Sequence, residues 1–216
     1  MGNKNKLAKF AEIATFGNVY QHTEALKGRW EDAFEKKQPL VVELACGKGE
    51  YTLGLSKQYP NKNFIGLDIK GNRIWKGAKQ ALDQNVRNVA FLRCQINLIT
   101  EYFEKGEVDE IWITFPDPQP RDGKAKKRLT HPLFLDRYKA IGKPSLIINL
   151  KTDSTLLYEF TKGVIAEHNL TLLQDNANIY SWEARPEELN IRTFYENIWL
   201  SEGILIKYLQ FQLKND

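Results

Sequence analysis

The sequence is poor in cysteine and contains no long apolar run. Only two of its 216 residues are cysteines, Cys46 and Cys94, too few for a disulfide framework or a thiolate zinc site. No stretch approaches the roughly 18 apolar residues of a membrane-spanning helix. The polar, basic start of the chain is not followed by the apolar segment of a secretory signal. These absences predict a cytoplasmic protein with no metal site and no attachment to a membrane.

The charge is nearly balanced overall but concentrated in one place. There are 31 lysines and arginines against 27 acidic residues, a formal net charge of +4, with 42% hydrophobic residues. This composition is typical of a soluble globular protein. In the octet 121–128, however, five cations accompany a single anion. Such a run is either a solvated loop or an element that binds phosphates.

From residue 39 onward, strand-like and helix-like segments alternate, whereas residues 1–38 show helical stretches and no strand pattern. We interpret 1–38 as a basic, helical N-terminal extension and 39–216 as one domain. Strands are expected at 40–44, 63–68, 89–94, 110–115 and 145–150, and helices at 50–58, 71–83, 132–141 and 154–168. This alternation predicts an α/β fold, a mostly parallel sheet with helices on both faces. Further strand-like runs lie around 171–173 and 205–213, and we expect the last to pair antiparallel at the sheet edge.

A strand, a glycine turn and a helix follow one another between Val42 and Glu50. Gly47 and Gly49 allow a ligand to approach the backbone, and Asp68 ends the next strand, where a carboxylate can accept from ribose hydroxyls. A dinucleotide site would need a third glycine where Thr52 stands. The acidic residues of the turn suit the positive sulfonium and ammonium groups of S-adenosylmethionine instead. A nicotinamide-dependent oxidoreductase is therefore the weaker interpretation, and a tight turn without a ligand is the structural alternative.

Carboxylates also follow the later strands. Asp117 stands between two prolines at the start of a long loop, 116–130, which begins at the sheet edge where α/β folds bind ligands. Asp153 follows another strand, and Glu196 closes the run Thr193-Phe194-Tyr195-Glu196. Each also has an ordinary explanation: a turn for Asp117, a helix cap for Asp153 and plain surface for Glu196.

Taken in order, the motifs ELACGKG, IGLD, FPDP with a basic tail ending in KKRLT, LKTD and TFYE are specific. From about Val41 to Glu196 the chain resembles the bacterial tRNA (guanine-N7)-methyltransferase family. The resemblance implies a Rossmann-like fold, S-adenosylmethionine as methyl donor and the variable-loop guanine of tRNA as acceptor. The sequence leaves open whether the chain works as a monomer or as a homodimer.

The resemblance, together with the glycine turn, assigns candidate site residues. Asp117 is the candidate catalytic residue. The expected cofactor site comprises Glu43, Gly47, Gly49, Asp68, Asn97 and Asp117. The expected tRNA-binding residues are Arg121, Lys124, Lys126, Lys127, Arg128, Asp153, Thr193 and Glu196. Three positions depart from the family: Ala45 replaces a glycine, Asn97 an aspartate and Gln119 a tryptophan.

The chemistry of guanine N7 explains why no obvious general base is needed. Its lone pair lies in the ring plane and carries no proton, so the enzyme has mainly to align the reactants. We expect Glu196 or Asp153 to read the Watson–Crick edge of an extruded guanine, because neither carboxylate has a cationic partner nearby in sequence. Two alternatives stay open: an inactive RNA-binding protein with this fold, and a methyltransferase for another acceptor.

Overall fold

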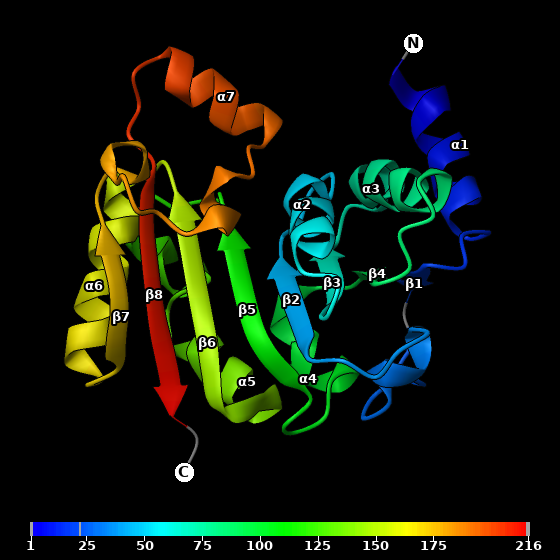
Figure 1. Cartoon of the computed structure of the whole chain (residues 1–216), viewed down its shortest axis with the longest axis horizontal. Helices are drawn as coiled ribbons and strands as arrows, with labels where there is room; N and C mark the ends of the chain where they lie inside the picture. Colours follow the sequence, from blue (N-terminus) through cyan, green and yellow to red (C-terminus); the bar gives the residue numbers. More distant parts are fainter. Residues whose placement is uncertain (1, 22, 215–216) are drawn as a thin grey trace.

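The computed structural model describes residues 2–21 and 23–214, which build one sheet of eight strands in the order β1-β4-β3-β2-β5-β6-β8-β7 (Figure 1). The strands are β1 Val19–Gln21, β2 Leu40–Leu44, β3 Asn63–Asp68, β4 Val89–Arg93, β5 Val108–Thr114, β6 Gly142–Thr152, β7 Thr171–Asn176 and β8 Lys207–Lys214. The helices are α1 Gly2–Ile13, α2 Glu50–Gln58, α3 Gly71–Asp83, α4 Ile99–Tyr102, α5 Pro132–Ile141, α6 Thr155–Glu167 and α7 Phe194–Ser201. The predicted α/β architecture is confirmed.

Helices cover both faces of the sheet, and each face has its own apolar core. Successive strand residues point to opposite faces, so Val42 belongs to the core under α4, α5 and α6, whereas Val41 belongs to the core under α2 and α3. This double coverage explains why β2 and β3 are buried at every residue. Strands of this kind read as continuous apolar runs rather than alternating ones.

The strand directions change near one edge of the sheet. Strands β1 to β6 pair in parallel, whereas β8 runs antiparallel to both β6 and β7. The predicted antiparallel pairing of the last strand is confirmed. The outermost strand is β7, with β8 between β7 and β6.

The N-terminal segment contributes to the sheet, so the expectation that it holds no strand is wrong. β1 pairs in parallel with β4, and at three residues it is too short to show a period in the sequence. Trp30 is fully buried, stacks on Phe103 with ring centroids 5.3 Å apart and donates its indole N–H to the Tyr102 carbonyl at 2.8 Å. This segment is therefore part of the packed core of the sheet.

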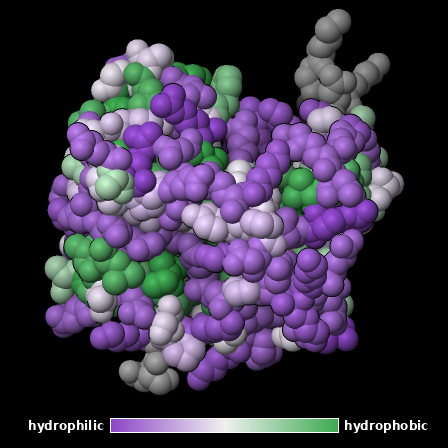
Figure 2. All heavy atoms as spheres, viewed as in Figure 1, coloured by the Kyte–Doolittle hydropathy of each residue, from purple (hydrophilic) through white to green (hydrophobic). Residues whose placement is uncertain are grey.

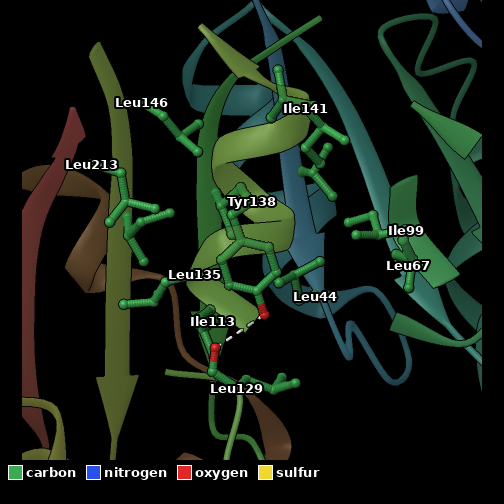
Figure 3. Close-up of a cluster of buried hydrophobic side chains, with 14 of the residues drawn as sticks. Leu44, Leu67, Ile99, Ile113, Leu129, Leu135, Tyr138, Ile141, Leu146 and Leu213 are labelled. Carbon is green, nitrogen blue, oxygen red and sulfur yellow. Dashed lines mark hydrogen bonds between the residues drawn. The ribbon is translucent and has the colours of Figure 1, made fainter. Parts of the chain in front are cut away.

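The long loop predicted at 116–130 is anchored to the core at its far end. Figure 3 shows Tyr138 of α5 among buried side chains, with its hydroxyl donating to the Leu129 carbonyl at 3.0 Å. The next helix starts at Pro132, where the His131 side chain accepts from the Leu133 N–H. Within the loop, Asp122–Lys127 forms a 3₁₀ helix. The loop is thus held at the edge of the sheet rather than extending freely from it.

The strand order places a crevice next to β2. From β2 the chain passes to β3 and β4 on one side, and later to β5 and β6 on the other. Open α/β sheets bind ligands at such a switch point, outside the carboxyl ends of the strands. In Figure 1 the carboxyl ends of β2, β5 and β6 point to the top of the view, toward α7.

Candidate active site

The turn after β2 has an unusual backbone. Ala45, Gly47 and Gly49 all have left-handed φ values, of 57°, 57° and 69°. A Cβ on Gly49 would lie 2.6 Å from a ring carbon of Phe91, so only glycine fits there. A Cβ on Gly47 would meet nothing closer than the Ala45 carbonyl oxygen at 3.9 Å. The backbone at Gly47 is therefore open on the side where a ligand could lie.

Asp68 ties this turn to the end of β3. Its Oδ2 accepts from the Gly47 N–H at 3.0 Å, and its Oδ1 accepts from the Lys70 N–H at 2.7 Å. The residue is buried. Each carboxylate oxygen has a second lone pair, so Asp68 can still accept from hydroxyl groups of a ligand while it holds the turn in place.

Glu43 lies beneath the turn, in the middle of the sheet. Its carboxyl group is buried and accepts hydrogen bonds from the hydroxyls of Thr52 on α2 and Thr114 on β5. Burial raises the pKa of Glu43 to about 7, although both hydrogen bonds act in the opposite direction. Because this pKa lies near neutrality, a cation bound close by would shift Glu43 to its charged form.

Two cavities meet at the glycine turn, with Ala45 in the wall of both. The larger cavity has a volume of about 670 Å³ and the smaller cavity about 300 Å³. The larger is lined by Ala45, Asp68, Ile69, Cys94, Gln95, Ile96, Asn97, Gln119, Lys126, Lys127, Leu133, Phe134 and Arg137. The smaller is lined by Glu43, Ala45, Cys46, Gly47, Lys48, Glu50, Tyr51, Arg73, Thr114, Phe115, Thr193, Tyr195 and Trp199. Adjoining cavities of this size suit an elongated small molecule and an acceptor group.

The three departures from the family all border these cavities. Asn97 and Gln119 line the larger cavity, beside Asp68. Gln119 also has a left-handed backbone, with φ 47°, and its N–H donates to Asp117 Oδ1 at 3.0 Å. Ala45 has a methyl group at a position whose left-handed backbone favours glycine. The changes at Asn97 and Gln119 therefore affect the shape and polarity of the larger cavity.

The basic loop divides into three groups. All four of Arg121, Lys124, Lys126 and Lys127 are exposed, but only Lys126 and Lys127 line the larger cavity. Arg128 is buried, donates to the carbonyls of Pro118 and Gln119, and lies 4.5 Å from the Phe160 ring centroid. Its guanidinium group stabilises the loop from within, which contradicts its expected place among the phosphate contacts.

Glu196 is not the unpaired carboxylate that the sequence indicated. It is fully buried, and its Oε1 lies 2.8 Å from Lys151 Nζ. The Tyr180 hydroxyl donates to the same oxygen at 2.8 Å, and Oε2 accepts from the Thr193 N–H at 3.3 Å. Together with Thr193 it forms the capping box that starts α7. The premise that Glu196 is free to read a base is therefore wrong.

Lys151, the partner of Glu196, is a residue that the sequence analysis missed. It lies in β6 and also donates to the Leu189 and Ile191 carbonyls, at 3.2 and 2.9 Å. Burial lowers the pKa of Lys151 to about 8, and the neighbouring Glu196 charge opposes this shift. A lysine inside an otherwise apolar strand was the available signal, since such a side chain requires a buried acceptor. The pair fixes α7, with Tyr195 and Trp199, above the smaller cavity.

Asp117 and Asp153 both lie at the carboxyl edge of the sheet but not in the walls of the two cavities. Asp117 is exposed, just past β5. Asp153 follows β6 and is partly buried; its carbonyl accepts from Lys207 Nζ at 3.0 Å. Burial raises the pKa of the Asp153 carboxyl, and the Lys207 charge lowers it by a smaller amount. The structure thus brings Glu43, Asp68 and Asn97 to the cavities and leaves these two carboxylates beside them.

Residues 37–209 match the model of a family described as putative methyltransferases. The chain is 47% identical to the tRNA (guanine-N(7)-)-methyltransferase of Christiangramia forsetii, over 99% of this chain and 100% of that protein. It is 43% identical to the enzyme of the same name from Bacteroides thetaiotaomicron, over 99% of this chain and 87% of that protein. The chain belongs to this methyltransferase family. The resemblance drawn from the motifs is confirmed, and the nicotinamide-dependent alternative is wrong.

Solved structures agree on the fold of this methyltransferase. The 16S rRNA methyltransferase KamB superposes with a TM-score of 0.65 at 14% identity, over 87% of this chain and 93% of that one. An S-adenosylmethionine-dependent methyltransferase from Aquifex aeolicus gives a TM-score of 0.56 at 12% identity, over 86% and 88%. At these identities the likeness concerns the fold alone, and it confirms the predicted Rossmann-like methyltransferase architecture.

Two further findings concern only the part of the chain that the structure describes. Among its helices, none has the length and apolar character needed to cross a membrane. Within the same residues, no cluster of three or more histidine, cysteine, aspartate or glutamate side chains is arranged to hold a metal ion.

Proposed function

We propose that this protein transfers a methyl group from S-adenosylmethionine to N7 of the variable-loop guanine of tRNA. The observation that carries the proposal is the meeting of two cavities at a glycine turn flanked by Glu43 and Asp68. The activity named for the full-length relatives, at 43% and 47% identity, supports the same conclusion. With tRNA as its substrate the protein would act in the cytoplasm, and we propose that it does so as a monomer or homodimer.

The residues of the two cavities fit the methyl donor. In the larger cavity, Asp68 would hold the ribose hydroxyls and Asn97 the adenine edge, because an amide both donates and accepts. In the smaller cavity, Glu43 and the open backbone at Gly47 would hold the positively charged methionine end. When bound, S-adenosylmethionine supplies an electrophilic methyl carbon. Carboxylates suit its two positive groups, whereas they would repel a pyrophosphate.

The protein's own contribution is alignment and electrostatics. Guanine N7 needs no deprotonation, so holding the base in line can supply roughly 7–11 kcal/mol of the barrier. Tyr195 and Trp199 line one side of the smaller cavity and would shield bound reactants from water on that side. Methylation at N7 leaves the purine cationic, so carboxylates at the edge of the sheet would stabilise the charge as it develops. Asp117, held between two prolines, is the candidate for this role; because it is exposed, we expect it to contribute less than the roughly 3–4 kcal/mol typical of a group in a site closed to water.

Asp153 is the carboxylate that we assign to the Watson–Crick edge of guanine, since Glu196 already binds Lys151. A carboxylate accepts from the N1–H and N2 amine of guanine together, whereas adenine offers an acceptor at N1. Asp153 lies near the smaller cavity along the backbone. It follows Lys151 by two residues, and the Lys151 carbonyl accepts from the N–H of Phe115, which lines that cavity, at 2.8 Å. Lys124, Lys126 and Lys127, with Arg121, would contact tRNA phosphates at the loop.

The test is methyl transfer from labelled S-adenosylmethionine to tRNA lacking the modification, followed by nucleoside analysis. Label should appear as 7-methylguanosine, and Asp117→Ala should abolish most of the transfer while leaving the binding of S-adenosylhomocysteine within a few-fold. Label in another nucleoside would refute the assignment of the acceptor. Binding of tRNA and S-adenosylhomocysteine without any transfer would favour the inactive RNA-binding alternative.

A further inference from the structure

A third hollow, about 450 Å³ in volume, lies between α2, α3 and α7 and adjoins the smaller cavity. We call it the α2–α3–α7 groove. Its lining residues come from three distant parts of the chain: Glu50, Leu53, Gly54, Lys57, Lys76, Gln80, Arg192, Phe194 and Asn197. It shares Glu50 with the smaller cavity, so the two hollows are neighbours.

The groove is strongly positive. Lys57, Lys76 and Arg192 line it, all of them exposed, and Glu50 is the single carboxylate among its lining residues. Glu50 is already engaged, because Oε2 accepts from the Phe194 N–H at 2.9 Å and Oε1 lies 3.8 Å from Lys76 Nζ. Lys48 and Arg73 add two cations in the lining of the adjoining smaller cavity. This charge balance suits a polyanion.

A ridge of two exposed aromatic rings separates the groove from the smaller cavity. Phe194 lines the groove and Tyr195 the cavity, and the two residues are 54% and 52% exposed. Their rings meet edge to face at 5.5 Å, and Lys48 Nζ lies 4.7 Å from the Phe194 ring centroid. Hydrophobic surface is visible over α7 at the upper left of Figure 2. Exposed aromatics beside cations are the side chains that hold single-stranded nucleic acid.

The ridge is rigidly mounted. Phe194 and Tyr195 are the first residues of α7, and the buried Lys151–Glu196 pair fixes this end of the helix to β6. Because the backbone that carries the two rings is fixed before any ligand arrives, little main-chain freedom remains to be lost on binding. An exposed aromatic pair between a cavity and a cationic groove suits a single strand of RNA, whose bases stack on rings while its phosphates contact cations.

We propose that the α2–α3–α7 groove binds the sugar–phosphate backbone next to the target guanine, and that Phe194 stacks on the neighbouring base. The inference rests on the proposed function, since the target guanine enters the smaller cavity. The basic loop 121–128 then contacts the tRNA on one side of the methylated base and the groove contacts it on the other. The extruded base is held between these two contact regions.

The test compares two double variants that change the net charge equally. Lys57→Gln/Lys76→Gln removes two cations of the groove. Lys79→Gln/Lys105→Gln removes two cations elsewhere, one paired with Asp83 on α3 and one in the loop before β5. The measurement is the affinity for tRNA as a function of salt. The groove variant should lower the slope of log K against log salt by about 1.4–1.8 and weaken binding roughly 10- to 30-fold at physiological salt.

A second variant tests the stacking. Phe194→Ala removes an exposed ring without opening a core cavity, and should weaken tRNA binding at least about fivefold with the salt slope unchanged. S-adenosylhomocysteine should bind all these variants as it binds the wild-type protein. Slopes and affinities equal to those of the control variant would refute the proposal. So would competition by polyglutamate as strong as that by polyuridylate, which would point to an acidic protein partner.

The result separates this proposal from the proposed function. If the wild-type protein forms no 7-methylguanosine but the groove variant loses tRNA affinity as expected, the proposed reaction is refuted and the proposal that the groove binds tRNA is supported. If the wild-type protein forms 7-methylguanosine and the groove variant binds tRNA like the control, the groove proposal alone is refuted.

Discussion

The buried ion pair between Lys151 and Glu196 should be one of the most sensitive points of the fold. Both side chains are fully buried, with 2.8 Å between Nζ and Oε1. Lys151→Met removes the cation and leaves the Glu196 carboxylate without its charge partner inside the protein. Removing one partner of a buried pair typically costs 3–5 kcal/mol, against a total stability of about 5–15 kcal/mol for a domain. We therefore expect Lys151→Met to lose about that much.

The double variant distinguishes a charge effect from a packing effect. In Lys151→Met/Glu196→Gln no charge is buried, and the remaining cost is the loss of the donor that Lys151 supplies to the Leu189 and Ile191 carbonyls. An amide oxygen can also still accept from the Thr193 N–H at the start of α7. We expect the double variant to recover at least about 2 kcal/mol relative to Lys151→Met, because replacing both members of such a pair is often near neutral.

The assay is urea unfolding followed by circular dichroism for the wild type, both single variants and the double variant. The coupling energy from this cycle isolates the pair if the m-values are unchanged. A loss below about 1 kcal/mol for Lys151→Met, or a coupling energy below about 0.5 kcal/mol, would contradict the reasoning. It would mean that water or a proton relieves the buried charge.

Three further predictions concern the turn, Glu43 and the basic loop. Ala45→Gly should raise the free energy of unfolding in urea by about 0.5–1 kcal/mol, because glycine relieves the left-handed backbone there; an unchanged or lower value would contradict this. Burial raises the pKa of Glu43 from 4.5 in the unfolded chain to about 7 in the folded protein. The protonated carboxyl group therefore stabilises the fold below pH 4.5, and this stabilisation is lost as the pH rises to about 7. The melting temperature of the wild type should show this loss with rising pH, and that of Glu43→Gln should not. S-adenosylmethionine should bind more tightly as the pH rises from about 6 to about 8, and equal pH dependence in Glu43→Gln would remove Glu43 from the site. Arg128→Ala should lower the free energy of unfolding in urea by about 1–3 kcal/mol, because the Pro118 and Gln119 carbonyls lose their hydrogen-bond donor. Lys124→Ala should leave the free energy of unfolding unchanged and lower the slope of log K for tRNA against log salt.

Local signals were enough to predict most of the sheet. The strands at 40–44 and 63–68 and the helix at 132–141 have the expected bounds, because apolar runs, prolines and caps mark them within a few residues. β1 was missed because three half-buried residues carry no period. β6 starts at Gly142, earlier than the expected start at 145, because its exposed lysine and proline, Lys143 and Pro144, read as loop.

The site was predictable where one segment builds it, and not where distant segments meet. The glycine turn and the carboxylate of Asp68 are adjacent to strand ends, so their placement follows from the parallel sheet. Lys151, the partner of Glu196, lies 45 residues earlier in the chain. The carbonyls that accept hydrogen bonds from the buried Arg128 belong to a loop with no regular sequence pattern. The α2–α3–α7 groove likewise combines three elements that only the folded chain brings together.

The most direct test of the central claim uses two tRNA transcripts that differ at one atom of the target base. One has guanosine in the variable loop and the other 7-deazaguanosine, in which a C–H group replaces N7. We expect both to bind with the same affinity, since N1–H, the N2 amine and the phosphates are unchanged, and only the guanosine transcript to accept the methyl group. Methyl transfer to the 7-deaza transcript would contradict the assignment of N7 as the nucleophile.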